Sequence, residues 1–99
     1  METQKDNLQL QSEFFGKRVV VTGGTKGMGK AITDRFLKAS ATVLAVARSI
    51  PKHQSDNLYF VKADIGTLTG ISDVVDGVNA RLGGLDVIVN NVGGSGSTL

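Results

Sequence analysis

Three glycines stand where an apolar segment passes into a segment with helical spacing. Residues 18–22 read R-V-V-V-T, which predicts a buried strand, and residues 28–39 repeat apolar side chains at the period of a helix. Between them, Gly23, Gly27 and Gly29 give the spacing G-x-x-x-G-x-G. A helix start carries unpaired N–H groups and the positive end of the helix dipole. Bare backbone at this point therefore predicts a phosphate-binding turn.

Each of the three glycines has its own expected task. Gly23 supplies the tight turn out of the strand, Gly27 brings bare backbone beside a pyrophosphate, and Gly29 allows close contact between helix and sheet. The alternative is a glycine-rich turn that binds no ligand. That alternative is disfavoured because three glycines at one helix start cost stability and, without a ligand, gain nothing in return.

The rest of the chain alternates strands with crossover segments. The predicted strands occupy residues 18–22, 42–47, 58–63 and 85–90. A second helix is expected from Leu68 to Leu82, ended by two glycines, whereas residues 49–57 form a link too short for a full helix. Right-handed crossovers on both faces then give an α/β fold, a partial doubly wound parallel sheet of Rossmann-like type with strand order 3-2-1-4. The fourth strand is expected to be an uncovered edge.

Three motifs in this order resemble the short-chain dehydrogenase/reductase family. Residues 22–29 resemble its T-G-x-x-x-G-x-G cofactor motif, and residues 63–65 resemble its D-V or D-I adenine-contact motif. Residues 90–93 resemble its N-N-A-G motif, with Val92 in place of alanine. The resemblance covers residues 17–94. It implies an oxidoreductase that transfers a hydride between a nicotinamide cofactor and a carbonyl or alcohol substrate, and it implies a homo-oligomer.

The resemblance also implies individual cofactor contacts. Asp64 would accept a hydrogen bond from the adenine amino group, and the Ile65 amide would donate to a ring nitrogen. Asn90 would lie near the cofactor and tie neighbouring strands together, while Asn91 serves backbone geometry. Gly93 would leave room for the nicotinamide ribose. A compatible second role for Asp64 is to cap the following helix.

The end of the second predicted strand favours NADP(H) over NAD(H). An acidic residue there would bind the adenine ribose hydroxyls of NAD and repel a 2′-phosphate, but the sequence has Ala47 and Arg48. Arg48 offers paired donors to a phosphate, although a solvated loop arginine is the alternative. Lys26 adds a second positive charge. The predicted cofactor contacts are Gly23, Thr25, Lys26, Gly27, Met28, Gly29, Arg48, Asp64, Ile65, Asn90 and Gly93.

Basic residues gather in the part of the chain that holds the glycine turn. Residues 14–62 carry nine Lys or Arg side chains against two Asp side chains, whereas residues 63–99 carry four Asp against one Arg. This asymmetry favours an anionic ligand at the turn. No basic run, aromatic stacking platform or reader-helix motif accompanies the charge, so no nucleic-acid partner is expected.

Other classes of protein are excluded by what the sequence lacks. It has no cysteine, which excludes disulfides, thiolate metal sites and cysteine nucleophiles, and no metal site is predicted. The apolar runs are far shorter than the ~20 residues of a membrane helix, so no membrane partner is expected. Residues 1–13 form a polar arm without a signal-peptide pattern, which indicates a cytoplasmic protein. Phe14 and Phe15 are the expected anchors of this arm.

The catalytic residues that the family resemblance implies are not found. The family uses a tyrosine as general acid/base, a lysine four residues later and an upstream serine. Tyr59 is the single tyrosine and is followed four positions later by Ala63, so no catalytic residue is predicted. We expect residues 14–99 to be the N-terminal part of a dinucleotide-binding domain, truncated before its active site and inactive alone. The alternative is a non-enzymatic NADP(H)-binding or interaction module.

Overall fold

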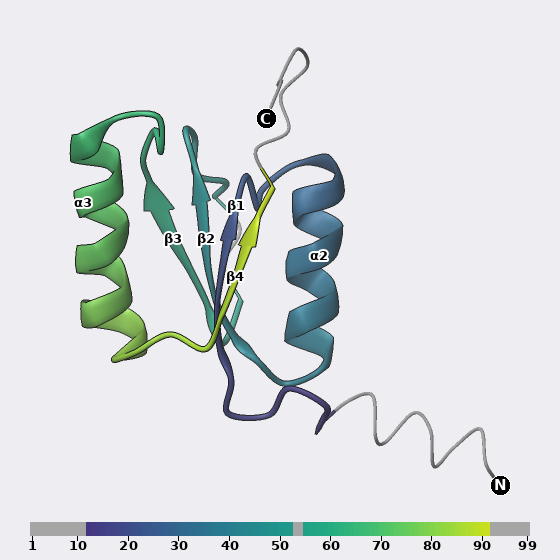
Figure 1. Ribbon diagram of the computed structural model, residues 1–99. Coiled ribbons are helices and arrows are strands. Elements are labelled where there is room, and N and C mark those ends of the chain that lie inside the picture. Colours follow the sequence, from purple (N-terminus) through teal and green to yellow (C-terminus); the bar gives the residue numbers. More distant parts are fainter. Residues whose placement is uncertain (1–11, 53–54, 92–99) are drawn as a thin grey trace, which may run out of the picture.

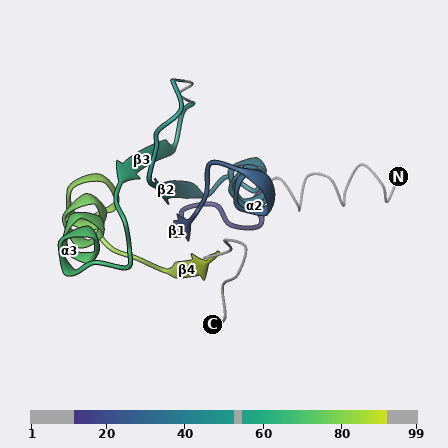
Figure 2. The ribbon, with the colours of Figure 1, turned by 90° about the horizontal axis from the view of Figure 1, so that it is seen from above.

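The computed structural model describes residues 12–52 and 55–91, which form one parallel sheet with a helix on each face (Figures 1 and 2). The sheet has four strands in the order β3-β2-β1-β4, so the predicted α/β fold and strand order are confirmed. The elements in chain order are β1 (Arg18–Thr22), α2 (Gly27–Lys38), β2 (Thr42–Ala47), β3 (Leu58–Lys62), α3 (Leu68–Gly77), the π-helix η1 (Val78–Leu82) and β4 (Val87–Asn90).

The two central strands are buried on both faces. β1 pairs in parallel with β2 and β4, and its Val20 lies opposite Leu44 on one side and Ile88 on the other. Val19 and Val21 face α2, whereas Val20 packs with Leu44 on the α3 side. Strands covered twice need apolar residues at every position, which explains why β1 and β2 read as continuous apolar runs.

The second helix differs from the single helix expected over residues 68–82. α3 passes into the wider π-helical turn η1, in which the Gly83 N–H donates to the Val78 carbonyl at 2.9 Å. Gly83 then ends the helix with a φ of 72°. Val78 and Leu82 both pack against the core on the α3 side, so tertiary packing accounts for the widened last turn.

One of the two expected anchors at the beginning of the domain was predicted wrongly. Phe14 packs against Phe36, with 4.9 Å between ring centroids, and its N–H donates to the Ala39 carbonyl at 2.9 Å. Phe15 is 77% exposed, whereas Phe14 is half-buried. Residues 1–11 of the predicted arm lie outside the described residues.

β4 forms an edge of the sheet, as expected, because it pairs only with β1 in the described part of the chain. Its Ile88 is 61% exposed on the face that carries α3. In Figure 2, α3 lies over the β3 side of the sheet and leaves β4 to one side. None of the described helices is both long and apolar enough to cross a membrane.

An ion pair fastens β4 to β1 at the end of the sheet where the strands begin. The Arg18 Nε donates to Asp86 Oδ2 at 3.0 Å, and the Arg18 backbone N–H donates to the same oxygen at 2.8 Å. The Asp86 N–H in turn donates to the Arg18 carbonyl at 2.9 Å. The hydrogen bonds that the carboxylate accepts, first from the Arg18 side chain and then from the Arg18 backbone N–H, lower the pKa of Asp86 to about 2.

This lowered pKa predicts a pH-dependent contribution to stability. Because the folded protein holds Asp86 ionised more strongly than the unfolded chain does, the contribution is complete above the ordinary pKa of 3.8 and is lost toward pH 2. We expect Asp86→Asn to be less stable than wild type at neutral pH, and the difference to shrink as pH falls through this window. Urea unfolding at a series of pH values measures it, with the exposed Asp76→Asn as control. An unchanged difference down to about pH 2 would contradict the assignment.

Candidate cofactor-binding site

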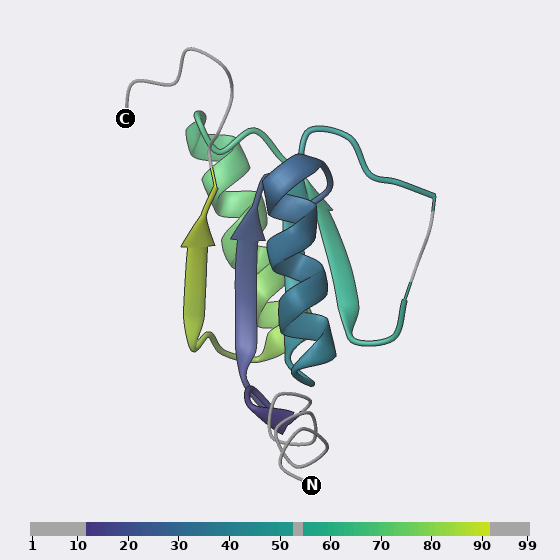
Figure 3. The ribbon, with the colours of Figure 1, turned by 90° about the vertical axis from the view of Figure 1, so that its right-hand side faces the viewer.

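The predicted cofactor residues gather where the four parallel strands end. Figure 1 shows the strand arrowheads pointing to one end of the sheet, and Figure 3 shows α2 and α3 on opposite faces, both starting at that end. The segments that follow the strands there begin with Gly23, Arg48, Ala63 and Asn91. In open parallel sheets this end, at the point where the strand order reverses, is the common place for ligands.

The glycine turn has the tight geometry that its spacing predicts. Gly23 has a φ of 66°, and its N–H donates to the Val46 carbonyl at 2.6 Å. A Cβ at Gly29 would overlap the Gly23 carbonyl oxygen, so the first turn of α2 lies directly on the end of β1. Gly27 has a φ of 54° and open space around it. Position 29 thus requires a glycine because of its close contact with the Gly23 carbonyl, and position 27 favours one because of its positive φ.

The N–H groups at the start of α2 are available to an anion, whereas one of those at the start of α3 is used by a capping side chain. Lys26 is the N-cap of α2, and its side chain makes no capping hydrogen bond. The first turn of α2 contains no acidic residue. In α3, by contrast, the Thr67 hydroxyl accepts a hydrogen bond from the Gly70 N–H at 2.9 Å. The free N–H groups and the helix dipole therefore favour an anionic group at α2.

A hydroxyl joins the end of β1 to the end of β4. The Thr22 Oγ1 donates to Asn90 Oδ1 at 2.9 Å and accepts from the Asn91 N–H at 2.8 Å. The Asn91 Nδ2 donates to the Gly23 carbonyl at 3.4 Å. Asn90 thus ties β4 to β1, as the family resemblance implies, and Asn91 contacts the glycine turn.

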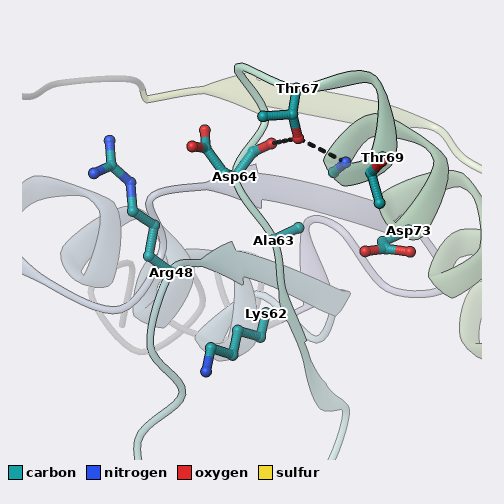
Figure 4. A pocket seen from close by; sticks show the side chains of 8 residues that line it. Arg48, Lys62, Ala63, Asp64, Thr67, Thr69 and Asp73 are labelled. Carbon is teal, nitrogen blue, oxygen red and sulfur yellow. Dashed lines mark hydrogen bonds between the residues drawn. The ribbon is translucent and has the colours of Figure 1, made fainter.

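A shallow pocket of about 410 Å³ lies between the ends of β2 and β3 and the start of α3 (Figure 4). The Arg48 guanidinium and the Asp64 carboxylate point to the same side of this pocket, whereas the Lys62 ammonium points away from them. The residue before Arg48 is Ala47, so no carboxylate from the end of β2 faces this space. The lining residues are Arg48, Lys62, Ala63, Asp64, Thr67, Thr69, Gly70 and Asp73.

Asp64 braces the turn before α3 but does not cap the helix. Its Oδ1 accepts from the Gly66 N–H at 2.8 Å, and its carbonyl accepts from the Thr67 hydroxyl at 2.8 Å. Thr67 is the N-cap, so the capping role considered for Asp64 is wrong. The turn that follows Asp64 engages one carboxylate oxygen, Oδ1, and the other, Oδ2, has no hydrogen-bond donor among the described residues.

The remaining predicted contacts are placed as follows. Thr25 is half-buried in the turn, and Met28 is 72% exposed in the first turn of α2. Ile65 is half-buried against the core on the α3 side, which leaves its backbone as the group available to a ligand. Gly93 lies outside the described residues. Tyr59 lies in β3 with the Arg81 guanidinium 5.6 Å from its ring centroid, so it packs within the fold.

Two residues of the site were not singled out from the sequence. Gly24 is buried, and a Cβ there would lie 2.9 Å from the Thr33 Oγ1 and 3.0 Å from the Ala45 Cβ. Thr33 is 2% exposed and donates to the Gly24 carbonyl at 3.3 Å. A polar residue on the apolar face of a helix was the available signal, because a buried hydroxyl requires a partner.

Known proteins resemble the chain over most of its length. A family model described as short chain dehydrogenase matches residues 17–99. Farnesol dehydrogenase from Aedes aegypti is 36% identical over 90 residues, which cover 81% of this chain and 37% of that protein. The chain therefore spans less than two fifths of the length of this relative.

Two solved structures with different bound cofactors share the fold. L-sorbose reductase from Gluconobacter frateurii, complexed with NADPH and L-sorbose, matches with a TM-score of 0.69 at 31% identity, over 82% of this chain and 35% of that one. 3-Ketoacyl-(acyl-carrier-protein) reductase from Brucella melitensis, complexed with NADH, matches with a TM-score of 0.70 at 26% identity, over 76% and 34%. The fold alone therefore does not select between the two cofactors.

Proposed function

Because this chain belongs to the short-chain dehydrogenase/reductase family, we propose that it binds NADP(H) in preference to NAD(H) and forms the cofactor-binding part of an oxidoreductase. The reaction is hydride transfer between the nicotinamide and a carbonyl or alcohol carbon of a small-molecule substrate, in an enzyme that is a homo-oligomer. The observation that carries the cofactor preference is the end of β2, where Arg48 lines the pocket beside Asp64 and follows Ala47 instead of a carboxylate.

The residues present fit such a dinucleotide at three points. The uncapped start of α2 suits a pyrophosphate, since its N–H groups are open and Gly27 is surrounded by free space. Arg48, Lys26 and Thr25 suit the 2′-phosphate, because they combine two positive charges with a hydroxyl. The Asp64 oxygen that the turn does not use suits the adenine amino group, and the Ile65 N–H suits a ring nitrogen.

Fewer described residues support the proposed binding of the nicotinamide end of the cofactor. When bound, the cofactor supplies the ring that gives or takes the hydride. Asn90 and Asn91 hold the end of β4 in place through the Thr22 hydroxyl, which fixes where the following segment begins. Room for the nicotinamide ribose at Gly93 stays a prediction.

Equilibrium binding tests the cofactor preference directly. We expect NADP⁺ to bind at least about tenfold more tightly than NAD⁺, because a charge-assisted hydrogen bond to the 2′-phosphate contributes roughly 1.5–3 kcal/mol. Titration calorimetry measures both dissociation constants. Adenosine 2′,5′-bisphosphate should also compete better than adenosine 5′-monophosphate. Equal binding of the two dinucleotides would exclude the preference, and binding of neither would exclude the cofactor site itself.

A further inference from the structure

Thr33 joins the helix α2 to the glycine turn through a buried hydrogen bond. Gly29 and Thr33 are the two buried residues of α2, and they lie one helical turn apart on the face that meets the sheet. Gly29 lies against the Gly23 carbonyl, and the Thr33 Oγ1 donates to the Gly24 carbonyl at 3.3 Å. The Gly23 and Gly24 carbonyls thus contact two consecutive helical turns of α2.

The hydrogen bond from Thr33 fixes the direction of one peptide group. The peptide between Gly24 and Thr25 is planar and trans, so its carbonyl and its N–H point in opposite directions. With the Gly24 carbonyl directed into the fold toward Thr33, the Thr25 N–H points out of the core. Among the described residues, the Thr25 N–H has no hydrogen-bond acceptor.

The outward N–H follows a part of the turn that is hydrogen-bonded to the end of β2. The N–H groups of Gly23 and Gly24 both donate to the Val46 carbonyl, at 2.6 and 3.3 Å. That carbonyl belongs to the end of β2, two residues before Arg48. The turn is therefore tied to the strand whose end carries the guanidinium, and Thr25 follows directly.

We propose that Thr33 is a positioning residue that favours a 2′-phosphate without touching it. Its hydroxyl holds the Gly24–Thr25 peptide so that the Thr25 N–H faces the same anion as Arg48. Without that hydroxyl, the Gly24 carbonyl loses its buried donor and can turn outward, which would present a carbonyl oxygen to the phosphate. The inference rests on the proposed binding of NADP(H) and adds a residue that selects it over NAD(H).

The test compares the two dinucleotides in the same variants. Thr33→Val removes the hydroxyl at nearly constant volume, and we expect it to weaken NADP⁺ binding about tenfold and NAD⁺ binding less than about threefold. Thr33→Ser keeps the donor and should restore the wild-type ratio of the two dissociation constants. Thr42→Val makes the same chemical change at the opposite end of the sheet, where β2 begins, and should leave the ratio unchanged.

Thermal unfolding of each variant separates positioning from folding. If Thr33→Val does not fold, Thr33→Ala, which also lacks the donor, carries the same expectation. Equal losses of NADP⁺ and NAD⁺ affinity, or failure of Thr33→Ser to restore the ratio, would overturn the role of Thr33 and leave the proposed function standing. If the wild-type chain binds neither dinucleotide, both proposals are overturned.

Discussion

Arg48→Ala is expected to lower NADP(H) affinity by more than about tenfold, while NAD(H) affinity changes by less than about threefold. The guanidinium lines the pocket on the same side as the Asp64 carboxylate, and Ala47 contributes no negative charge there. In the variant, the 2′-phosphate of NADP(H) loses a charged guanidinium that donates paired hydrogen bonds. The ribose hydroxyl of NAD(H) loses at most one hydrogen bond to a neutral oxygen. Titration of both dinucleotides with both proteins measures the effect.

Two further variants show whether the geometry or the charge of the Arg48 side chain is responsible for the expected preference for NADP(H). Arg48→Lys keeps the charge but not the planar pair of donors, so we expect an intermediate loss of NADP(H) affinity. Lys52→Ala removes one positive charge from the same exposed link, outside the lining of the pocket, and should leave the ratio of affinities unchanged. An equal loss for both dinucleotides in Arg48→Ala would contradict a contact with the 2′-phosphate.

The sequence predicts the central part of this fold well because burial there is strongly patterned. β1 and β2 are covered on both faces, so the positions between their ends must be apolar, and their predicted bounds match the structure. β4 starts at Val87, two residues later than expected, because Asp86 is engaged with Arg18. The ion pair and the π-helical turn depend on contacts distant in sequence, which a local pattern does not contain.

In the candidate site, too, the local features were predictable from the sequence and the contacts between more distant residues were not. The glycine turn was predictable because its requirements are local: a positive φ at Gly23 and close contact at Gly29 follow from spacing along one strand–helix unit. Ser40, just after α2, has a φ of 70°, in the left-handed region that favours glycine. The contact between Thr33 and Gly24 joins residues nine positions apart through space, so no motif indicated it.

The structure shows contacts of Asp64 that its sequence motif alone does not predict. The motif implied an adenine contact for Asp64 and was compatible with a second role as a helix cap. The structure gives the cap to Thr67 and uses one Asp64 oxygen in the turn, which leaves the other oxygen available to a ligand. A carboxylate that is held in this way is positioned before a ligand arrives, which reduces the entropy cost of binding.

The second large effect is expected at Gly29. In an exposed helix, alanine is more stable than glycine by about 0.5–1 kcal/mol. Here a Cβ would overlap the Gly23 carbonyl oxygen and lie 2.6 Å from the Asn91 Nδ2. The carbonyl cannot withdraw freely, because the Gly24 N–H of the same peptide group donates to the Val46 carbonyl at 3.3 Å and the Gly23 N–H donates to it at 2.6 Å. We therefore expect Gly29→Ala to lower the free energy of unfolding by about 1–3 kcal/mol, and to weaken both dinucleotides, since the turn that holds the pyrophosphate must move.

The control for this prediction is the reverse exchange on the exposed side of the same helix. Ala31→Gly, at an exposed position of α2, should cost about 0.5–1 kcal/mol by helix propensity alone and leave dinucleotide binding unchanged. Together the two variants separate the intrinsic preference of α2 for alanine from the contact at Gly29. Urea unfolding and titration of NADP⁺ and NAD⁺ measure both quantities. If Gly29→Ala stabilises the chain by as much as Ala31→Gly destabilises it, then the close approach of α2 to the end of β1 is not what requires a glycine at that position.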